Sequence, residues 1–332
     1  MKAVQLLGEM GSPRIVTNSA MEKPTPTGCD ILVSVFAAGV TGDAVTWPET
    51  YATPSRIPGH EVSGSIAAFG PDYAGGLVLG QLIYAFISAE RGQGQADFVV
   101  CSPNEVAPKP TTISHAEAAA LPIPLLTAWE ALKDHGNMSA GMGVLVTGAS
   151  GAVGSLSVQM AAQVKDSRVI ALASSQHHKW LQTLGATETI DYKTEGWEAT
   201  VQAVDVVFDT VGGDILTKAW NTIKDRGIII TVGDPAPAWA FGKAEPREAS
   251  QHPNARYKYF IVSPNAKRLA EAATLVDEGG IKSLAVERFS FDDASEAWAF
   301  ARRRGRGKKA VIDFEGKCPR SGASVPDGNI SP

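Results

Sequence analysis

Cysteine is scarce in this chain, and its scarcity limits the kinds of site that the protein can build. The 332 residues include 3 cysteines, Cys29, Cys101 and Cys318, which lie far apart in the sequence. That spacing excludes a disulfide framework and a zinc site made mainly of thiolates. Scattered cysteines are typical of a reducing compartment, so we expect a cytoplasmic protein.

Excess positive charge and long apolar runs are missing as well. The 30 lysines and arginines are outnumbered by 35 aspartates and glutamates, which gives a net charge of −5. Such a chain has no overall field that gathers nucleic-acid phosphates, and the basic run at 302–309 suits a helix end. No apolar run approaches the ~18 residues of a membrane helix, and the first residues lack the pattern of a signal peptide. We expect neither nucleic acid nor membrane as a partner.

Short strands separated by glycine and proline fill the first third of the chain. Candidate strands lie at 31–35, 62–67, 82–86 and 96–100, and such close spacing predicts a β-rich barrel or sandwich. Farther on, Ser114 and Glu117 have the spacing of a capping box, which predicts a helix that ends near Leu121.

From about residue 125, apolar strands alternate with amphipathic helices, a pattern that predicts a doubly wound parallel sheet and an α/β fold. Its strands are expected at 143–147, 168–173, 205–209, 227–232 and 258–262, with a long loop at 235–254. A helix at 266–277, a strand at 286–289, a helix at 292–302 and a strand at 310–314 follow, and we expect 315–332 to be a loose polar tail.

The strongest chemical signal is a glycine loop between a strand and a helix. The run Gly-Ala-Ser-Gly-Ala-Val-Gly at 148–154 follows the strand at 143–147 and opens the next helix. Glycines there permit a tight turn and a close approach of the backbone to a pyrophosphate, which the helix N-terminus then binds. The loop therefore predicts dinucleotide binding, with a structural turn as the alternative.

The residues after the second strand of this unit bear on which dinucleotide is bound. An NAD enzyme usually carries an acidic residue about 20 positions beyond the loop, where it holds the ribose 2′-hydroxyl. Here the segment from Ala173 to Lys179 contains serines, histidines and a lysine but no carboxylate. Hydroxyls and a lysine suit a 2′-phosphate, which favours NADPH. The alternative is that Lys179 is a solvated helix residue.

Several motifs in a specific order carry a family resemblance. They are Ala-Gly-Val-Thr at 38–41, Pro-Gly-His-Glu-Val-Ser-Gly at 58–64, Leu-Pro at 121–122, Leu-Thr-Ala-Trp at 126–129, the glycine loop, Leu-Gly-Ala at 184–186, Phe-Asp-Thr-Val-Gly-Gly at 208–213 and Gly-Lys at 307–308. By these motifs, residues 1–314 resemble the medium-chain dehydrogenase/reductase superfamily, in particular its zinc-independent quinone oxidoreductase and enoyl reductase branch. The resemblance implies a GroES-like β-rich catalytic domain at 1–124, completed by 264–314, and a Rossmann NADPH-binding domain at 125–263. The active site would lie in the cleft between them.

The resemblance also implies which residues bind the cofactor. Thr127 would contact the nicotinamide end, and Lys308 belongs to the closing Gly-Lys motif. The remaining expected contacts are Gly148, Ser150, Gly151, Ala152 and Val153 at the pyrophosphate, Ser174, Ser175, Lys179 and Tyr192 around the 2′-phosphate and adenosine, and Val211, Gly212, Val232, Gly233, Phe260, Ile261 and Val262 along the cofactor.

Zinc-dependent relatives carry a cysteine where this chain has Thr41, and they also have a four-cysteine lobe that is missing here. A hydroxyl is a poor zinc ligand, and a catalytic zinc needs three protein ligands. We therefore expect no metal. The alternative is a zinc-type alcohol dehydrogenase with altered ligands, in which Glu61 or Asp43 assists His60.

Without a metal, the protein must itself orient an acceptor and stabilise the charge that develops on its oxygen. Tyr51 lies where related enoyl reductases carry a tyrosine near the substrate, so it is a candidate proton or hydrogen-bond donor, a pocket wall, or plain packing. Thr41 is the second candidate donor. We expect Trp47 and His60 to line the substrate pocket.

These inferences converge on an NADPH-dependent oxidoreductase that reduces an activated C=C or C=O in a small apolar molecule, such as a quinone, enone or enoyl compound. An NADPH-binding sensor or partner protein with little catalysis is an alternative of a different class. The strand at 258–262 would leave an open sheet edge. Resemblance implies that relatives pair this edge across a two-fold axis, so a homodimer is expected unless the loop at 235–254 covers the edge.

Overall fold

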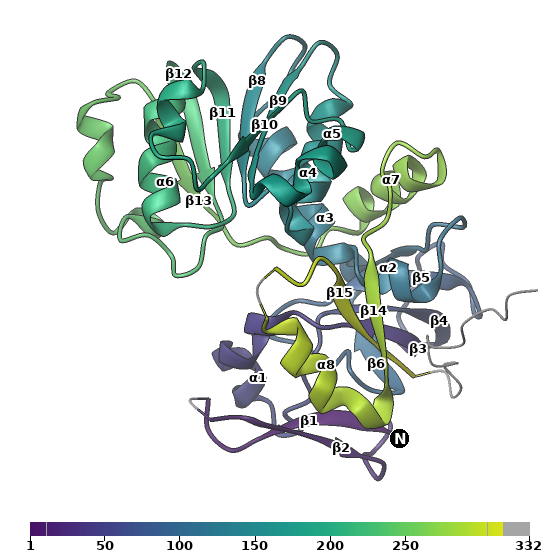
Figure 1. The fold of residues 1–332 in the computed structure, drawn as a ribbon. Helices are drawn as coiled ribbons and strands as arrows, with labels where there is room; N and C mark the ends of the chain where they lie inside the picture. Colours follow the sequence, from purple (N-terminus) through teal and green to yellow (C-terminus); the bar gives the residue numbers. More distant parts are fainter. Residues whose placement is uncertain (11, 304, 315–332) are drawn as a thin grey trace, which may run out of the picture.

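The structure, a computed structural model, describes residues 1–10, 12–303 and 305–314. The expected polar tail at 315–332 lies outside these residues. The described chain forms two lobes, each built on a large sheet (Figure 1). No helix in the described part is long and apolar enough to cross a membrane.

The first lobe contains a mixed sheet of seven strands in which strands from early and late in the chain pair. Its order is β14-β15-β3-β4-β5-β7, with β6 also paired to β3, and a hairpin of β1 and β2 lies beside it. The strands are β1 Ala3–Leu7, β2 Arg14–Asn18, β3 Ile31–Gly39, β4 Glu61–Phe69, β5 Leu82–Phe86, β6 Phe98–Cys101, β7 Val106–Pro108, β14 Val286–Ser290 and β15 Lys309–Asp313. Because β15 pairs with β3, the C-terminal segment completes the sheet that the N-terminal segment begins.

The second lobe is a parallel sheet of six strands in the order β10-β9-β8-β11-β12-β13. The strands are β8 Gly143–Thr147, β9 Arg168–Ala173, β10 Glu188–Asp191, β11 Val204–Asp209, β12 Ile223–Thr231 and β13 Arg256–Tyr259. Alternate residues of β8 enter two cores, with Val144 packed on the α4 side and Leu145 on the α6 side. This division of apolar residues between two covered faces is the reason that the strands read as continuous hydrophobic runs.

The helices are α1 Pro48–Ala52, α2 His115–Ala119, α3 Pro122–Trp129, α4 Ala152–Ala162, α5 His178–Thr183, α6 Gly213–Ala219, α7 Ala266–Asp277 and α8 Ala294–Ala301. The largest hydrophobic core joins the two lobes, because it contains Tyr84 of β5 together with residues of α3, α4 and α7. The Tyr84 hydroxyl donates a hydrogen bond of 2.5 Å to the Leu269 carbonyl. These contacts hold the lobes in one arrangement around the cleft between them.

The end of β13 differs from the sequence-based prediction. The strand was expected over 258–262, but it ends at Tyr259. Phe260 instead turns into the large core, where its ring meets the His135 ring edge-on at 5.0 Å. Core burial of this aromatic ring draws the chain out of the sheet and toward α7, so Ile261 and Val262 lie beyond the strand.

Candidate functional site

The glycine loop makes a tight connection from β8 into α4. Gly148 has a φ of +59°, a left-handed conformation that favours glycine. A Cβ on Gly154 would lie 2.3 Å from the Gly148 carbonyl oxygen, so only glycine lets the helix approach the loop this closely. Among the described residues no side chain caps the N-terminus of α4 at Gly151. The backbone amides of the first turn therefore remain available for an anion.

A buried carboxylate ties the loops at the carboxyl ends of the parallel strands together. Asp209 accepts hydrogen bonds of 2.6 Å from the hydroxyls of both Thr147 and Thr231. The Gly212 amide also donates to it at 3.0 Å, and a Cβ on Gly233 would lie 2.6 Å from that same amide nitrogen. Asp209 thus positions the loops that carry Val211, Gly212, Val232 and Gly233. Sequence reasoning used this aspartate only as part of a motif and missed its role as a clamp.

A cavity of about 440 Å³ lies between the glycine loop and the segment that leads into β15. Ser150, Gly151 and Ala152 line one side, and Lys308 and Lys309 are among the basic residues on the other. The Lys308 ammonium donates to the Glu287 carboxylate at 2.7 Å. The structure therefore brings the expected pyrophosphate loop and the closing Gly-Lys motif to one cavity.

The expected adenosine end includes a carboxylate that sequence reasoning overlooked. Asp191 ends β10 opposite Ala173 of β9, and its carboxylate accepts a hydrogen bond of 3.2 Å from the Ser175 amide. The Lys193 amide donates to the same carboxylate and holds its pKa below the usual range. The sequence search covered only the end of β9, whereas a parallel neighbour ends at the same edge of the sheet. Lys179, in α5, and Tyr192, which directly follows Asp191, are both exposed.

The expected nicotinamide end is partly apolar. Thr127 is buried in α3, and its hydroxyl donates to the Ile123 carbonyl at 2.7 Å. Val211 and Ile261 are large apolar side chains that stay exposed, with 67% of Ile261 open to solvent. Exposed aliphatic side chains beside this sheet edge are suited to pack against the flat face of a bound ring.

The two aromatic candidates in the first lobe differ in what they contact. The Tyr51 hydroxyl donates to the Val45 carbonyl at 2.7 Å, and burial raises its pKa. The Trp47 ring lies 4.8 Å from the His60 ring, between centroids. Trp47 and His60 thus pack against each other, while the Tyr51 hydroxyl proton is engaged within its own loop.

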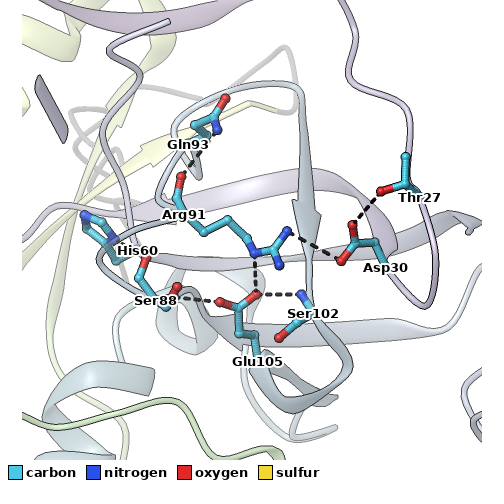
Figure 2. Close-up of polar contacts among 8 residues, drawn as sticks. All are labelled: Thr27, Asp30, His60, Ser88, Arg91, Gln93, Ser102 and Glu105. Carbon is cyan, nitrogen blue, oxygen red and sulfur yellow. Dashed lines mark hydrogen bonds and ion pairs between the residues drawn. The ribbon is translucent and has the colours of Figure 1, made fainter. Parts of the chain in front are cut away.

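His60 is deeply buried and its second ring nitrogen is free. The side chain is 2% exposed, Nδ1 lies 3.3 Å from the Ser88 carbonyl oxygen, and Nε2 has no hydrogen-bond partner in the described part of the chain. Burial lowers the pKa of His60, so the imidazole stays neutral. Figure 2 shows how Glu105 fixes the neighbouring loop by accepting from the Ser88 and Ser102 amides and from Arg91.

Glu61 is a second buried carboxylate that several protein donors engage. This carboxylate is 0% exposed; Oε2 accepts from the Thr41 hydroxyl at 2.8 Å and from the Lys309 ammonium, and Oε1 accepts from the Ile123 amide at 3.0 Å. Sequence reasoning proposed Thr41 but missed Lys309, which is only 6% exposed. Alternation along the last strand would have allowed it to point inward, but nothing local distinguishes it from Lys308.

The described residues contain no group of three or more His, Cys, Asp or Glu side chains arranged to hold a metal ion. Both oxygens of Glu61 are engaged by protein donors. The uncapped amides at the start of α4 can bind an anion beside the basic residues of the cavity.

Comparison with known proteins gives a consistent set of relatives. Residues 184–311 match the family model described as zinc-binding dehydrogenase. A probable zinc-binding oxidoreductase, mitochondrial, of Arthroderma benhamiae is 30% identical over 314 residues, covering 88% of this chain and 92% of the relative. The 2-methylene-furan-3-one reductase of Solanum lycopersicum is 31% identical, covering 77% of this chain and 63% of the relative. A mitochondrial NAD(P)H oxidoreductase of Homo sapiens is 29% identical, covering 76% of this chain and 69% of the relative.

A solved structure shares the fold over nearly the whole chain. The quinone oxidoreductase from Coxiella burnetii superposes with a TM-score of 0.79 and 24% identity, covering 94% of this chain and 99% of that one. The arrangement of a β-rich sheet lobe and a Rossmann-type parallel sheet is therefore that of a known oxidoreductase fold.

Proposed function

Because the chain belongs to the medium-chain dehydrogenase/reductase superfamily, we propose that it is an NADPH-dependent, zinc-independent oxidoreductase that reduces an activated C=C or C=O. The substrate class is a small apolar quinone, enone or enoyl-type molecule. The observation that carries the proposal is the cleft itself, where an anion-binding glycine loop shares a cavity with Lys309, and Lys309 is joined to Glu61 and Thr41.

The residues present fit a nicotinamide dinucleotide. Gly148 and Gly154 let the loop and α4 pack closely together, and the amides at the start of α4 would hold a pyrophosphate. The loops clamped by Asp209 would lie along the ribose, and Thr127 would meet the nicotinamide end. When bound, this cofactor supplies the hydride.

The preference for NADPH is supported by the exposed Lys179 and by the hydroxyls of Ser174 and Ser175. A cation and hydroxyl donors stabilise a 2′-phosphate by charge-assisted hydrogen bonds. Asp191 opposes this preference through its negative charge, but its carboxylate is engaged by two backbone amides.

Zinc independence is supported by the chemistry of Glu61. Its carboxylate accepts hydrogen bonds from three donors, one of them a buried ammonium that balances its charge. A metal cation is therefore not needed to stabilise it. Thr41 replaces a thiolate with a weak ligand. The neutral imidazole of His60 and the Trp47 ring then form a pocket wall for an apolar acceptor.

The substrate class is supported by the names of two similar proteins, a 2-methylene-furan-3-one reductase and a quinone oxidoreductase. Both names describe an acceptor in which a carbonyl is conjugated with a C=C bond. An apolar wall with few charges suits such flat molecules.

The test measures NADPH oxidation by absorbance with a panel of enones and quinones, together with the metal content of the protein. We expect reduction of at least one conjugated acceptor, no stoichiometric zinc and no loss of activity to a chelator. Ser150→Asp should abolish the reaction, because it places a carboxylate beside the expected phosphate site without altering the pocket wall.

Stoichiometric zinc with activity lost to a chelator would support a zinc-type alcohol dehydrogenase instead. Tight NADPH binding without reduction of any acceptor would support a sensor or partner protein.

A further inference from the structure

We propose that Thr41, Glu61 and Lys309 form a proton relay that protonates the acceptor after it has received a hydride. The inference rests on the proposed function, because it assigns the source of the second hydrogen that such a reduction consumes. The sequence predicted Thr41 only as a second candidate donor, and neither Glu61 nor Lys309 was predicted to take part in proton transfer.

The three side chains form one continuous hydrogen-bonded chain. The Thr41 hydroxyl donates to Glu61 Oε2 at 2.8 Å, and the Lys309 ammonium donates to the same oxygen. Glu61 Oε1 accepts from the Ile123 amide at 3.0 Å, which prevents the carboxylate from rotating. A proton that Lys309 gives to Oε2 is therefore already within reach of the Thr41 oxygen.

The two ends of the chain lie in different surroundings. Thr41 is half-buried at the start of the segment that carries Trp47, and the relay assigns its hydroxyl to the acceptor end. Lys309 lines the 440 Å³ cavity beside the glycine loop, so this end can regain a proton from water when the cofactor leaves that cavity. Glu61, between them, is fully buried. The three groups therefore form a buried proton-transfer chain rather than a surface ion pair.

The proton transfer balances as follows. The acceptor carbon gains two electrons and a hydrogen as hydride, which leaves an enolate or alkoxide. This anion takes the proton from the Thr41 hydroxyl, Thr41 takes a proton from Glu61 Oε2, and Glu61 takes one from the Lys309 ammonium. Lys309 becomes neutral and regains its proton from solvent. The acceptor thus ends with a hydride from the cofactor and a proton from water.

The surroundings of Lys309 favour release of its proton. Burial lowers the pKa of its ammonium, while Glu61 and, more weakly, Asp43 oppose this shift and Arg306 adds to it. A buried lysine and glutamate pair contributes little net stability compared with an apolar pair of the same size. Stability alone is therefore a weak reason for placing this pair at the centre of the cleft.

The test compares Lys309→Met and Thr41→Val with the parent protein, using 3-penten-2-one as acceptor in water and in D₂O. If the relay is correct, both variants should oxidise NADPH in the first turnover at a rate within about threefold of the parent rate. Steady-state turnover should then fall by about a hundredfold or more, as expected for loss of a general acid, with a larger solvent isotope effect. Lys224→Met is the matched control, because Lys224 pairs with Asp205 at 2.8 Å on the surface. It should behave like the parent.

A second experiment separates proton donation from charge. Lys309→Ala leaves a space beside Glu61, and ethylammonium should restore turnover there because it carries both a charge and transferable protons. Tetramethylammonium carries the charge alone and should restore nothing. Thermal unfolding of each variant verifies folding. In the free protein, the Lys309 ammonium resonance should shift in Thr41→Val, because both groups share one carboxylate oxygen.

The outcomes distinguish the relay from the proposed function. An active parent with unchanged turnover in Lys309→Met, or an equal fall of first-turnover and steady-state rates, would overturn the relay alone. Restoration by tetramethylammonium would also overturn it. If Tyr51→Phe shows the predicted pattern and Thr41→Val does not, Tyr51 is the donor and the relay is wrong. A parent that reduces no acceptor would overturn both proposals.

Discussion

Single residues at the adenosine end carry charges of both signs. Lys179 is exposed and favours a 2′-phosphate, whereas Asp191 accepts the Ser175 amide and repels one. The balance between these two charges decides how strongly the protein prefers NADPH. The Ser175 amide is also withdrawn from direct phosphate binding, because Asp191 already engages it.

We expect Lys179→Ala combined with Ser175→Asp to weaken NADPH binding by about tenfold or more while sparing NADH, because a charge contact is replaced by repulsion. Asp191→Asn is the matched opposite change, and it should strengthen the binding of NADPH relative to that of NADH. Fluorescence titration gives both dissociation constants. Equal affinity of the parent for the two cofactors would contradict the preference.

The residues that the sequence did not reveal share a physical reason. Lys309 and Lys308 are adjacent, and only the pairing of β15 with β3 decides which one points toward Glu61. Asp209 clamps three strand ends because those strands are neighbours in the sheet. Local patterns predict which residues lie in a strand, but they do not predict which strands end side by side.

At the scale of elements, α2 begins with a pH-sensitive contact. Ser114 and Glu117 form the predicted capping box, and His115 is the first helical residue. His115 Nδ1 lies 2.8 Å from the Ser63 hydroxyl, and its ring meets Phe36 edge-on at 4.8 Å. Burial, with help from the nearby charge of Lys109, lowers the pKa of His115 to about 4.

This shift predicts a loss of stability in mild acid. Between pH 6.5 and about 4 the unfolded chain binds a proton at His115 that the folded chain does not, so the free energy of unfolding falls as pH decreases through this window. Because the side chain is half-buried, we expect only about 1 kcal/mol. Urea unfolding of the parent and His115→Gln at a series of pH values measures the difference. Identical pH profiles would refute the assignment.

Sequence patterns predicted best the elements in which buried apolar residues follow one regular pattern. The strands at 82–86, 143–147 and 168–173 and the helix at 266–277 have the predicted bounds. The helix α3, which contains two prolines, was not predicted. Both lie in its first turn, where the missing amide costs no hydrogen bond. The hairpin of β1 and β2 was also missed, since little of β2 is buried.

At the scale of the whole molecule, the open edge of the parallel sheet bears on assembly. β13 is its last strand, and the loop before it places Trp239 against Tyr257 and Phe241 against Tyr259. Phe241 is nonetheless 63% exposed. The loop therefore packs on side chains of β13 while leaving apolar surface uncovered.

We expect a homodimer that buries this edge, because an exposed strand edge with apolar neighbours favours pairing. Light scattering at micromolar concentration should then give twice the chain mass of 34.9 kDa. Phe241→Glu should shift the protein toward the single-chain mass by placing a charge in the contact. A parent that scatters as one chain would mean that the loop alone protects the edge.

The return of the C-terminal segment to the first sheet has a consequence for synthesis on the ribosome. All strands of the parallel sheet lie between residues 143 and 259, so that lobe can fold as soon as this stretch has emerged. The first sheet must wait for β15, which pairs with β3 only after residue 313 has left the exit tunnel. The nascent chain therefore carries an incomplete N-terminal sheet, in which residues 37–39 of β3 lack their partners in β15, through most of translation. The part of the protein made first is the last to be finished, and it is the part that a chaperone would need to shield.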